Sequence, residues 1–154
     1  PKIFLDDLPR LQEYSQQQKL IGKSYPFRMI SRRLPRSHNT WTHNSYRLIK
    51  GKNQVTLQIH PQDAKSLGIT NGEIVSVESP TGKIQIETEL YENMMLGVVS
   101  IPQGWGHNHK NTRMNTAAKN PGVSINSLTD DNRVDLLTGN AAFNGTPVLV
   151  AKFS

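Results

Sequence analysis

The sequence predicts a mainly β fold, a compact β-barrel with short helices. Several short segments alternate between apolar and polar residues, which is typical of strands that bury one face. Turns rich in Gly, Asn and Pro separate these segments, and one clear helix lies among them. Many short strands around a single small helix favour a closed barrel over a sandwich. With 154 residues, the chain is long enough for one domain with its own core.

The N-terminal part of the chain is polar. Its spaced apolar positions indicate one short helix: Leu8, Leu11 and Tyr14. The three glutamines at 16–18 indicate a linker after that helix. We therefore expect residues 1–24 to be a lead-in to a missing upstream part and residues 25–154 to form the barrel domain.

The first half of the barrel contains two expected strands and the clear helix. Residues 25–30 alternate loosely and are rich in β-formers, and residues 55–59 alternate cleanly, so both predict strands. Residues 61–67 predict a short helix. Proline suits its first turn, aspartate its positive end and glycine its stop: Pro61, Asp63 and Gly68.

The second half of the barrel is dominated by a predicted hairpin. Residues 73–79 and 83–90 alternate, and the Pro-Thr-Gly turn at 80–82 joins them. Residues 98–101 and 147–151 are short β-branched runs that predict two further strands.

Positive charge is concentrated near the start of the chain, although the net charge of the whole is +6. Seven basic residues and no acid lie in one stretch: Lys23, Arg28, Arg32, Arg33, Arg36, Arg47 and Lys50. Such a block indicates an anionic partner, which is a phosphate group, a nucleic acid or an acidic surface. The alternative is a solvated basic face without a partner.

Composition excludes several kinds of function. No apolar run approaches the length of a membrane helix, so we expect no membrane insertion. The absence of cysteine excludes disulfides, thiolate metal sites and cysteine nucleophiles. His107 and His109 lack a third ligand, so no metal site is expected. No phosphate-binding P-loop or Gly-x-Ser-x-Gly elbow is present, and no catalytic residue is predicted. Because the chain begins at Pro1, we expect a piece of a longer protein.

The most informative stretch is residues 98–129. There a β-rich run is broken by the loop Gly104-Trp105-Gly106-His107, and a polar Asn-Ser-Leu-Thr segment follows some twenty residues later. Glycines on both sides of the tryptophan allow the backbone to come close to a bound group. The indole offers a flat surface, and the polar side chains offer hydrogen-bond donors. The stretch therefore predicts a loop that holds a large polar ligand.

At this point the order of motifs resembles a known family. The strand, the Pro-x-Asp-Ala helix ending in Leu-Gly-Ile and the Gly-led hairpin within residues 55–90 are similar to the C-terminal molybdopterin-dinucleotide-binding domain of the dimethyl-sulfoxide-reductase family of molybdenum and tungsten oxidoreductases. FRMISRR and SHNTWTHN upstream, and IPQGWGH and INSLTDD downstream, are similar to its cofactor loops and closing section. The resemblance covers residues 25–152.

The resemblance implies a double-psi β-barrel that grips molybdopterin guanine dinucleotide and helps close the active site. It also implies that the metal, molybdenum or tungsten, is held mainly by absent domains, so that the isolated chain lacks the cofactor and is not catalytic alone. The implied partners are the remaining domains of the parent oxidoreductase and an iron–sulfur electron-transfer subunit, with no nucleic acid. The substrate and the compartment, bacterial-type cytoplasm or periplasm, stay open.

Three segments far apart in the sequence, 33–44, 103–108 and 124–129, are polar, rich in Gly or Asn and poor in periodic apolar residues. A barrel rim that binds a dinucleotide would bring them together, so we expect them to line one cleft. Arg33 is the leading phosphate contact, because a guanidinium binds phosphate oxygens in pairs. Asn126 matches the family's Asn-x-Leu-Thr motif, and its amide suits a heterocycle edge. The other expected contacts are Ser37, His38, Asn39, Thr40, Asn44, Gln103, Trp105, Gly106, His107 and Ser127.

Each of these expectations has an alternative. Arg33 could make a surface or interdomain contact, the Ser-His-Asn-Thr loop could be a self-bonded turn, and Trp105 could pack on a neighbouring domain. At the level of the whole chain, the alternatives are a nucleic-acid-binding β-barrel and a free-standing double-psi barrel for protein recognition. A pI of 9.7 favours nucleic acid, but the strands lack the interleaved exposed aromatics that stack bases.

Overall fold

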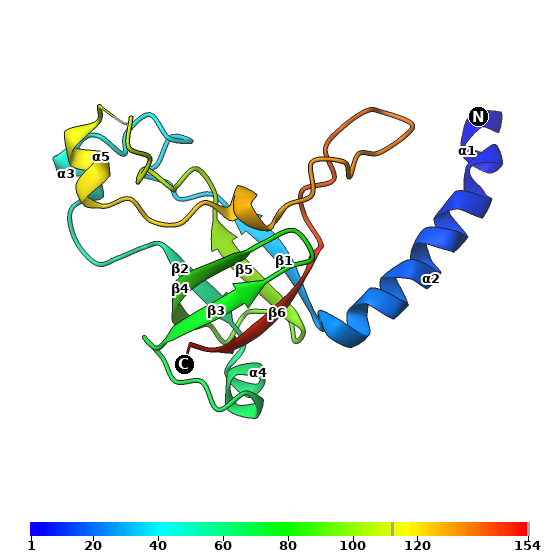
Figure 1. Cartoon of the computed structure of the whole chain (residues 1–154), viewed down its shortest axis with the longest axis horizontal. Coiled ribbons are helices and arrows are strands. Elements are labelled where there is room, and N and C mark those ends of the chain that lie inside the picture. Colours follow the sequence, from blue (N-terminus) through cyan, green and yellow to red (C-terminus); the bar gives the residue numbers. More distant parts are fainter. Residues whose placement is uncertain (112, 154) are drawn as a thin grey trace.

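A computed structural model describes residues 1–111 and 113–153, and in this part of the chain six strands close into one barrel (Figure 1). The order around the barrel is β1-β5-β2-β4-β3-β6, and β6 pairs with β1 to close it. The strands are β1 (Phe27–Arg32), β2 (Thr56–Ile59), β3 (Ile74–Glu78), β4 (Lys83–Leu90), β5 (Val98–Pro102) and β6 (Thr146–Lys152). The prediction of a mainly β barrel is confirmed, with each expected strand found within two residues of its predicted bounds.

The helices lie before and between the strands. They are α1 (Lys2–Asp6), α2 (Leu8–Ser24), α3 (Tyr46–Ile49), α4 (Pro61–Ser66), α5 (Asn115–Lys119) and the 3₁₀ helix η1 (Ile125–Leu128). The predicted helix at 61–67 is α4, and it begins with a proline in its first turn as expected. None of the helices in the described residues combines the length and the hydropathy of a membrane-spanning segment.

Two strand pairs are parallel, and one of them places the candidate site. β1 runs parallel to β5 with Arg32 opposite Pro102, and β2 runs parallel to β4. Because parallel strands end at the same edge of a sheet, the chain leaves β1 and β5 side by side. The backbone N–H of Gln103 donates to the carbonyl of Arg32 at 3.0 Å, so the two loops begin in contact.

The core fills the barrel with side chains from alternate strand positions. Met29, Leu57, Ile59 and Ile101 are among its fully buried members. The helix η1 adds Ile125 and Leu128 to the same cluster. The polar Asn-Ser pair between them is exposed at the barrel end. The segment that sequence patterning left without an apolar period therefore closes the core with two residues and presents two others to solvent.

The N-terminal helix differs from the sequence prediction. Residues 16–18 were expected to form a linker, but they lie inside the continuous helix α2. Glutamine is a good helix former, and no glycine or proline interrupts the segment between Arg10 and Lys19. In Figure 1, α1 and α2 project away from the barrel, and neither helix contains a buried residue.

Candidate cofactor-binding site

The loops that follow β1 and β5 pack directly on each other. Gly104 has a φ of +86°, and a Cβ added there would lie 2.8 Å from the carbonyl oxygen of Asn39. Asn39 and its neighbour His38 have left-handed backbones, with φ values of 61° and 41°. Such conformations cost free energy in non-glycine residues and persist where the surroundings hold them. The hydroxyl of Ser37 donates to the carbonyl of Asn39 at 2.6 Å and supports this strained turn.

His43 is the centre of the contact between the two loops. It is 1% exposed, and its imidazole stacks on the indole of Trp105 with ring centroids 3.8 Å apart. Its Nδ1 lies 2.8 Å from Nε2 of His107, and its Nε2 contacts the hydroxyl of Ser37. Sequence patterning did not single out His43, because nothing local distinguishes it from the other polar residues of its loop.

One assignment of the protons satisfies the contacts among Ser37, His43 and His107 together. Since the hydroxyl proton of Ser37 goes to a carbonyl, Nε2–H of His43 donates to the Ser37 oxygen. Nδ1 of His43 then accepts from Nε2–H of His107. Burial lowers the pKa of His43, the neighbouring His107 lowers it further, and the Gly104 carbonyl partly offsets this. Burial also lowers the pKa of His107, so the pair favours the neutral state.

The glycines around Trp105 are explained by packing within the chain. A Cβ at Gly106, where φ is +110°, would lie 2.7 Å from Cβ of Ser124. A Cβ at Gly122 would lie 2.9 Å from Cβ of Trp105. These glycines were expected to allow the close approach of a ligand, whereas their closest neighbours are atoms of the chain itself. A ligand contact of Gly106 stays a prediction.

A cavity of about 300 Å³ brings together residues from all three expected segments. Its lining is made of amide, hydroxyl and glycine groups with one aromatic ring: Asn39, Thr40, Gln103, Gly104, Asn126 and Phe143. These residues come from the loop after β1, the loop after β5, η1 and the segment before β6. The donor set suits the edge of a polar heterocycle.

A second cavity, of about 410 Å³, is lined in part by the same two loops. Ser37, His43 and Trp105 form part of its wall, and apolar residues of the 48–55 and 121–123 segments form another part. The indole Nε1 of Trp105 is buried and has no hydrogen-bond partner among the described residues. A buried donor without an acceptor is uncommon and leaves room for an acceptor from outside the chain.

The remaining expected contacts lie around these cavities. Arg33 is exposed directly after β1, and no hydrogen bond or ion pair of its side chain is found in the described part of the chain. The side-chain oxygen of Asn44 accepts from the backbone N–H groups of Thr116 and Ala117, so it caps α5. Ser127 is exposed on η1. Ligand contacts of these three side chains stay predictions.

A match to a known protein family identifies the family of this chain. Residues 27–147 match the family described as the molydopterin dinucleotide binding domain. The chain belongs to this family. The match covers the whole barrel up to the start of β6, and it includes both loops and η1. The resemblance to the dimethyl-sulfoxide-reductase family is thereby confirmed, and dinucleotide binding is favoured over nucleic-acid binding.

Known proteins similar to this molydopterin dinucleotide binding domain are much longer. It is 34% identical to the F420-dependent formate dehydrogenase subunit alpha of Methanocaldococcus jannaschii over 68% of this chain and 16% of that protein. It is 28% identical to the dimethyl sulfoxide reductase DmsA of Escherichia coli over 78% of this chain and 14% of that protein. The chain therefore spans less than a fifth of the relatives it matches.

One solved structure supports the fold. Acetylene hydratase from Pelobacter acetylenicus superimposes with a TM-score of 0.71 over 88% of this chain and 19% of that chain, at 20% sequence identity. The likeness confirms the expected barrel fold class, a double-psi β-barrel with short helices between its strands.

Proposed function

We propose that this domain grips molybdopterin guanine dinucleotide between its own polar cavity and the other domains of a longer molybdenum or tungsten oxidoreductase, and helps close the active site. The cavity lined by Asn39, Gln103 and Asn126 is the observation that carries the proposal. It joins three segments that are far apart in sequence, and the family is defined by dinucleotide binding.

The residues present fit such a ligand. Amide and hydroxyl groups of the cavity can donate to and accept from a pterin or guanine edge. Arg33 and Arg36 are exposed on the loop that also contributes Asn39 and Thr40 to the cavity, and a guanidinium can bind two phosphate oxygens of a pyrophosphate at once. The unpartnered indole N–H of Trp105 provides a further donor.

The bound cofactor supplies the redox chemistry, and the chain's own residues bind, orient and shield it. The stack of His43 on Trp105 holds the two loops at a fixed separation. The left-handed turn at His38 and Asn39 keeps the cavity wall in one conformation. A wall held in place before binding lowers the entropy cost of ordering the loop around its ligand.

The proposal includes the rest of the parent protein. We propose that residues 1–24 connect the barrel to upstream domains, that those domains hold the metal, and that an iron–sulfur electron-transfer subunit is a further partner. The small share of each relative that the chain covers supports this arrangement. We further propose that the domain is not catalytic alone and that its anionic ligand is a dinucleotide and not a nucleic acid.

Guanosine diphosphate is a suitable probe, because it carries the guanine and the pyrophosphate without the pterin. We expect the chain to bind it weakly, since half of the site lies in other domains. Arg33→Ala should weaken that binding about tenfold or more, the usual effect of losing a hydrogen bond to a charged group. Lys65→Ala, on the exposed surface of α4, is the matched control. Equal losses in both variants would show a generic anion effect and contradict the proposal.

A further inference from the structure

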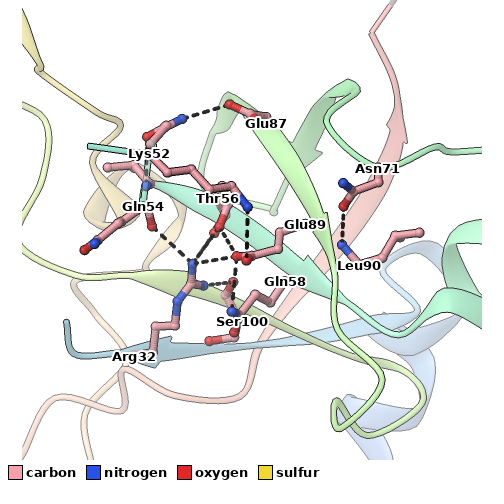
Figure 2. A network of polar contacts seen from close by, with 12 residues as sticks. Arg32, Lys52, Gln54, Thr56, Gln58, Asn71, Glu87, Glu89, Leu90 and Ser100 are labelled. Carbon is pink, nitrogen blue, oxygen red and sulfur yellow. Dashed lines mark hydrogen bonds and ion pairs between the residues drawn. The ribbon is translucent and has the colours of Figure 1, made fainter. Parts of the chain in front are cut away.

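Arg32 occupies an unusual place at the end of β1. The core-facing positions of this strand are Phe27 and Met29, so Arg32 lies on the outer face of the barrel. Its side chain is nevertheless only 17% exposed. Figure 2 shows it reaching across β5 towards β2, with Glu89 of β4 beyond.

The guanidinium holds two strands at once. Its Nη1 donates to the carbonyl of Ser100 in β5 at 2.5 Å. Its Nη2 donates to the carbonyl of Thr56 in β2 at 2.8 Å, to the Thr56 hydroxyl at 2.9 Å and to the carbonyl of Gln54 at 3.3 Å. Two different nitrogen atoms therefore serve two different strands.

The sequence explains why the side chain is needed there. β2 and β5 pair antiparallel at Gln58 with Ser100 and at Ile59 with Val99. Continuing that register would set Thr56 opposite Pro102, which has no N–H to donate. The pairing of β2 with β5 ends at Gln58 and Ser100, and there the guanidinium of Arg32 donates to carbonyl groups on both strands.

A carboxylate completes the cluster. Glu89 accepts from the Thr56 hydroxyl at 2.6 Å and from the Gln58 amide at 3.2 Å, and it lies 4.0 Å from Nη2 of Arg32. Burial lowers the pKa of Arg32 to about 10, and Glu89 partly offsets this. Arg32 is thus charged at neutral pH, with Glu89 beside it and both of its Nη atoms hydrogen-bonded inside the fold.

The strands that Arg32 joins lead into the candidate site. β1 continues into the loop with His43, and β5 continues into the loop with Trp105. The segment before β2, which includes Gln54, lines the larger cavity. We infer that Arg32 is a positioning residue. Its guanidinium bonds to β5 and β2 where their pairing ends, and it thereby sets the separation of the two loops that carry the proposed cofactor contacts. The link to cofactor contacts rests on the proposed function, whereas the link to loop separation does not.

Lysine cannot replace this arginine. A lysine ammonium is a single point of donation, whereas Ser100 and Thr56 are served by separate nitrogens. Arg32→Lys keeps the charge beside Glu89 but loses the hydrogen bonds to one of the two strands. Thr56→Val is a milder variant of similar size, which removes one acceptor of Nη2 and keeps the arginine.

The test uses the labelled chain and two readouts. The first is the NMR shift of the Trp105 indole N–H and of the His43 and His107 imidazole nitrogens, without ligand. The second is the affinity for guanosine diphosphate. Val77→Ala, in the core of β3 away from the loops, is the control for a general loss of stability.

We expect Arg32→Lys to move the indole and imidazole signals, and Thr56→Val to move the same signals part of the way. Val77→Ala should leave them in place. Guanosine diphosphate should bind about tenfold more weakly to Arg32→Lys than to Val77→Ala. Unchanged side-chain signals in Thr56→Val would overturn the inference, even if Arg32→Lys failed to fold. Absence of nucleotide binding in the parent chain would contradict the proposed function. The NMR signals of the ligand-free chain would still test whether Arg32 sets the separation of the loops.

Discussion

The imidazole of His43 lies on the indole of Trp105, with ring centroids 3.8 Å apart and ring planes inclined by 20°. One residue follows β1 and the other follows β5, so the stack fastens the two loops that leave a parallel strand pair. His107 meets the same imidazole edge-on, and its Nε2 is hydrogen-bonded to Nδ1 of His43. The candidate cavity is therefore framed by loops whose relative position is fixed within the free chain.

Removing the indole should loosen this frame. Trp105→Ala is expected to lower the free energy of unfolding by roughly 2–3 kcal/mol, somewhat below the usual cost for a fully buried aromatic ring, because Trp105 is half-buried. Trp105→Phe keeps a ring on His43 and should lose less than half as much. Urea denaturation measures both. Equal losses would show that a ring on His43 does not stabilise the two loops, and would contradict this role of the stack.

The histidine pair should make stability depend on pH. The pKa values of His43 and His107 lie below the ordinary 6.5 in the folded chain. As the pH falls below 6.5, the unfolded chain therefore takes up protons first, and stability is lost as the pH falls through the folded pKa values. Above 6.5 this contribution is fully present. Urea denaturation between pH 5 and pH 8 should show the decline.

His43→Phe is the matched variant, because it keeps a ring against Trp105 and removes the titration. Its stability should change less with pH over the same range. The titration of Glu89 does not contribute to the change in stability between pH 5 and pH 8. The pKa of Glu89 lies below 4.5 in the folded chain, chiefly through the Thr56 hydroxyl, so its contribution is lost only at more acid pH. An identical slope in His43→Phe and the parent chain would contradict the assignment.

Two glycines with left-handed backbones should respond very differently to alanine. Gly106→Ala adds a Cβ that would lie 2.7 Å from Ser124, in addition to its unfavourable φ of +110°. Gly139, with a φ of +71°, has no atom within 4 Å of an added Cβ. We expect losses of about 3 kcal/mol for Gly106→Ala and about 1 kcal/mol for Gly139→Ala. Thermal unfolding measures both losses, and equal losses in the two variants would contradict this explanation by packing.

The strands were predictable because their signal is local. Residues 83–90 alternate strictly, and the structure pairs them as expected with residues 74–78. The length of α2 was not predicted, because a run of glutamines is equally compatible with a polar linker and with an exposed helix. The spacing of Leu8, Leu11 and Tyr14 indicated only the start of this helix, and no buried face marks in the sequence how far it continues.

The site was predictable only as a set of segments. The family resemblance pointed to Asn39, Gln103 and Asn126, and the structure places all three at one cavity. His43 was missed because its partner His107 lies 64 residues further along the chain. Arg32 and Arg33 are adjacent, and nothing in their order indicates which one the barrel buries and which one stays exposed.

We expect the cavity lined by Asn39, Gln103 and Asn126 to hold the dinucleotide. To test this, the isotopically labelled chain is titrated with purified molybdopterin guanine dinucleotide, and backbone and side-chain amide shifts are followed by NMR. The largest shifts should occur at Asn39, Gln103 and Asn126, with smaller ones at Arg33 and Trp105. Shifts confined to α1 and α2, or spread evenly over all exposed basic residues, would contradict it.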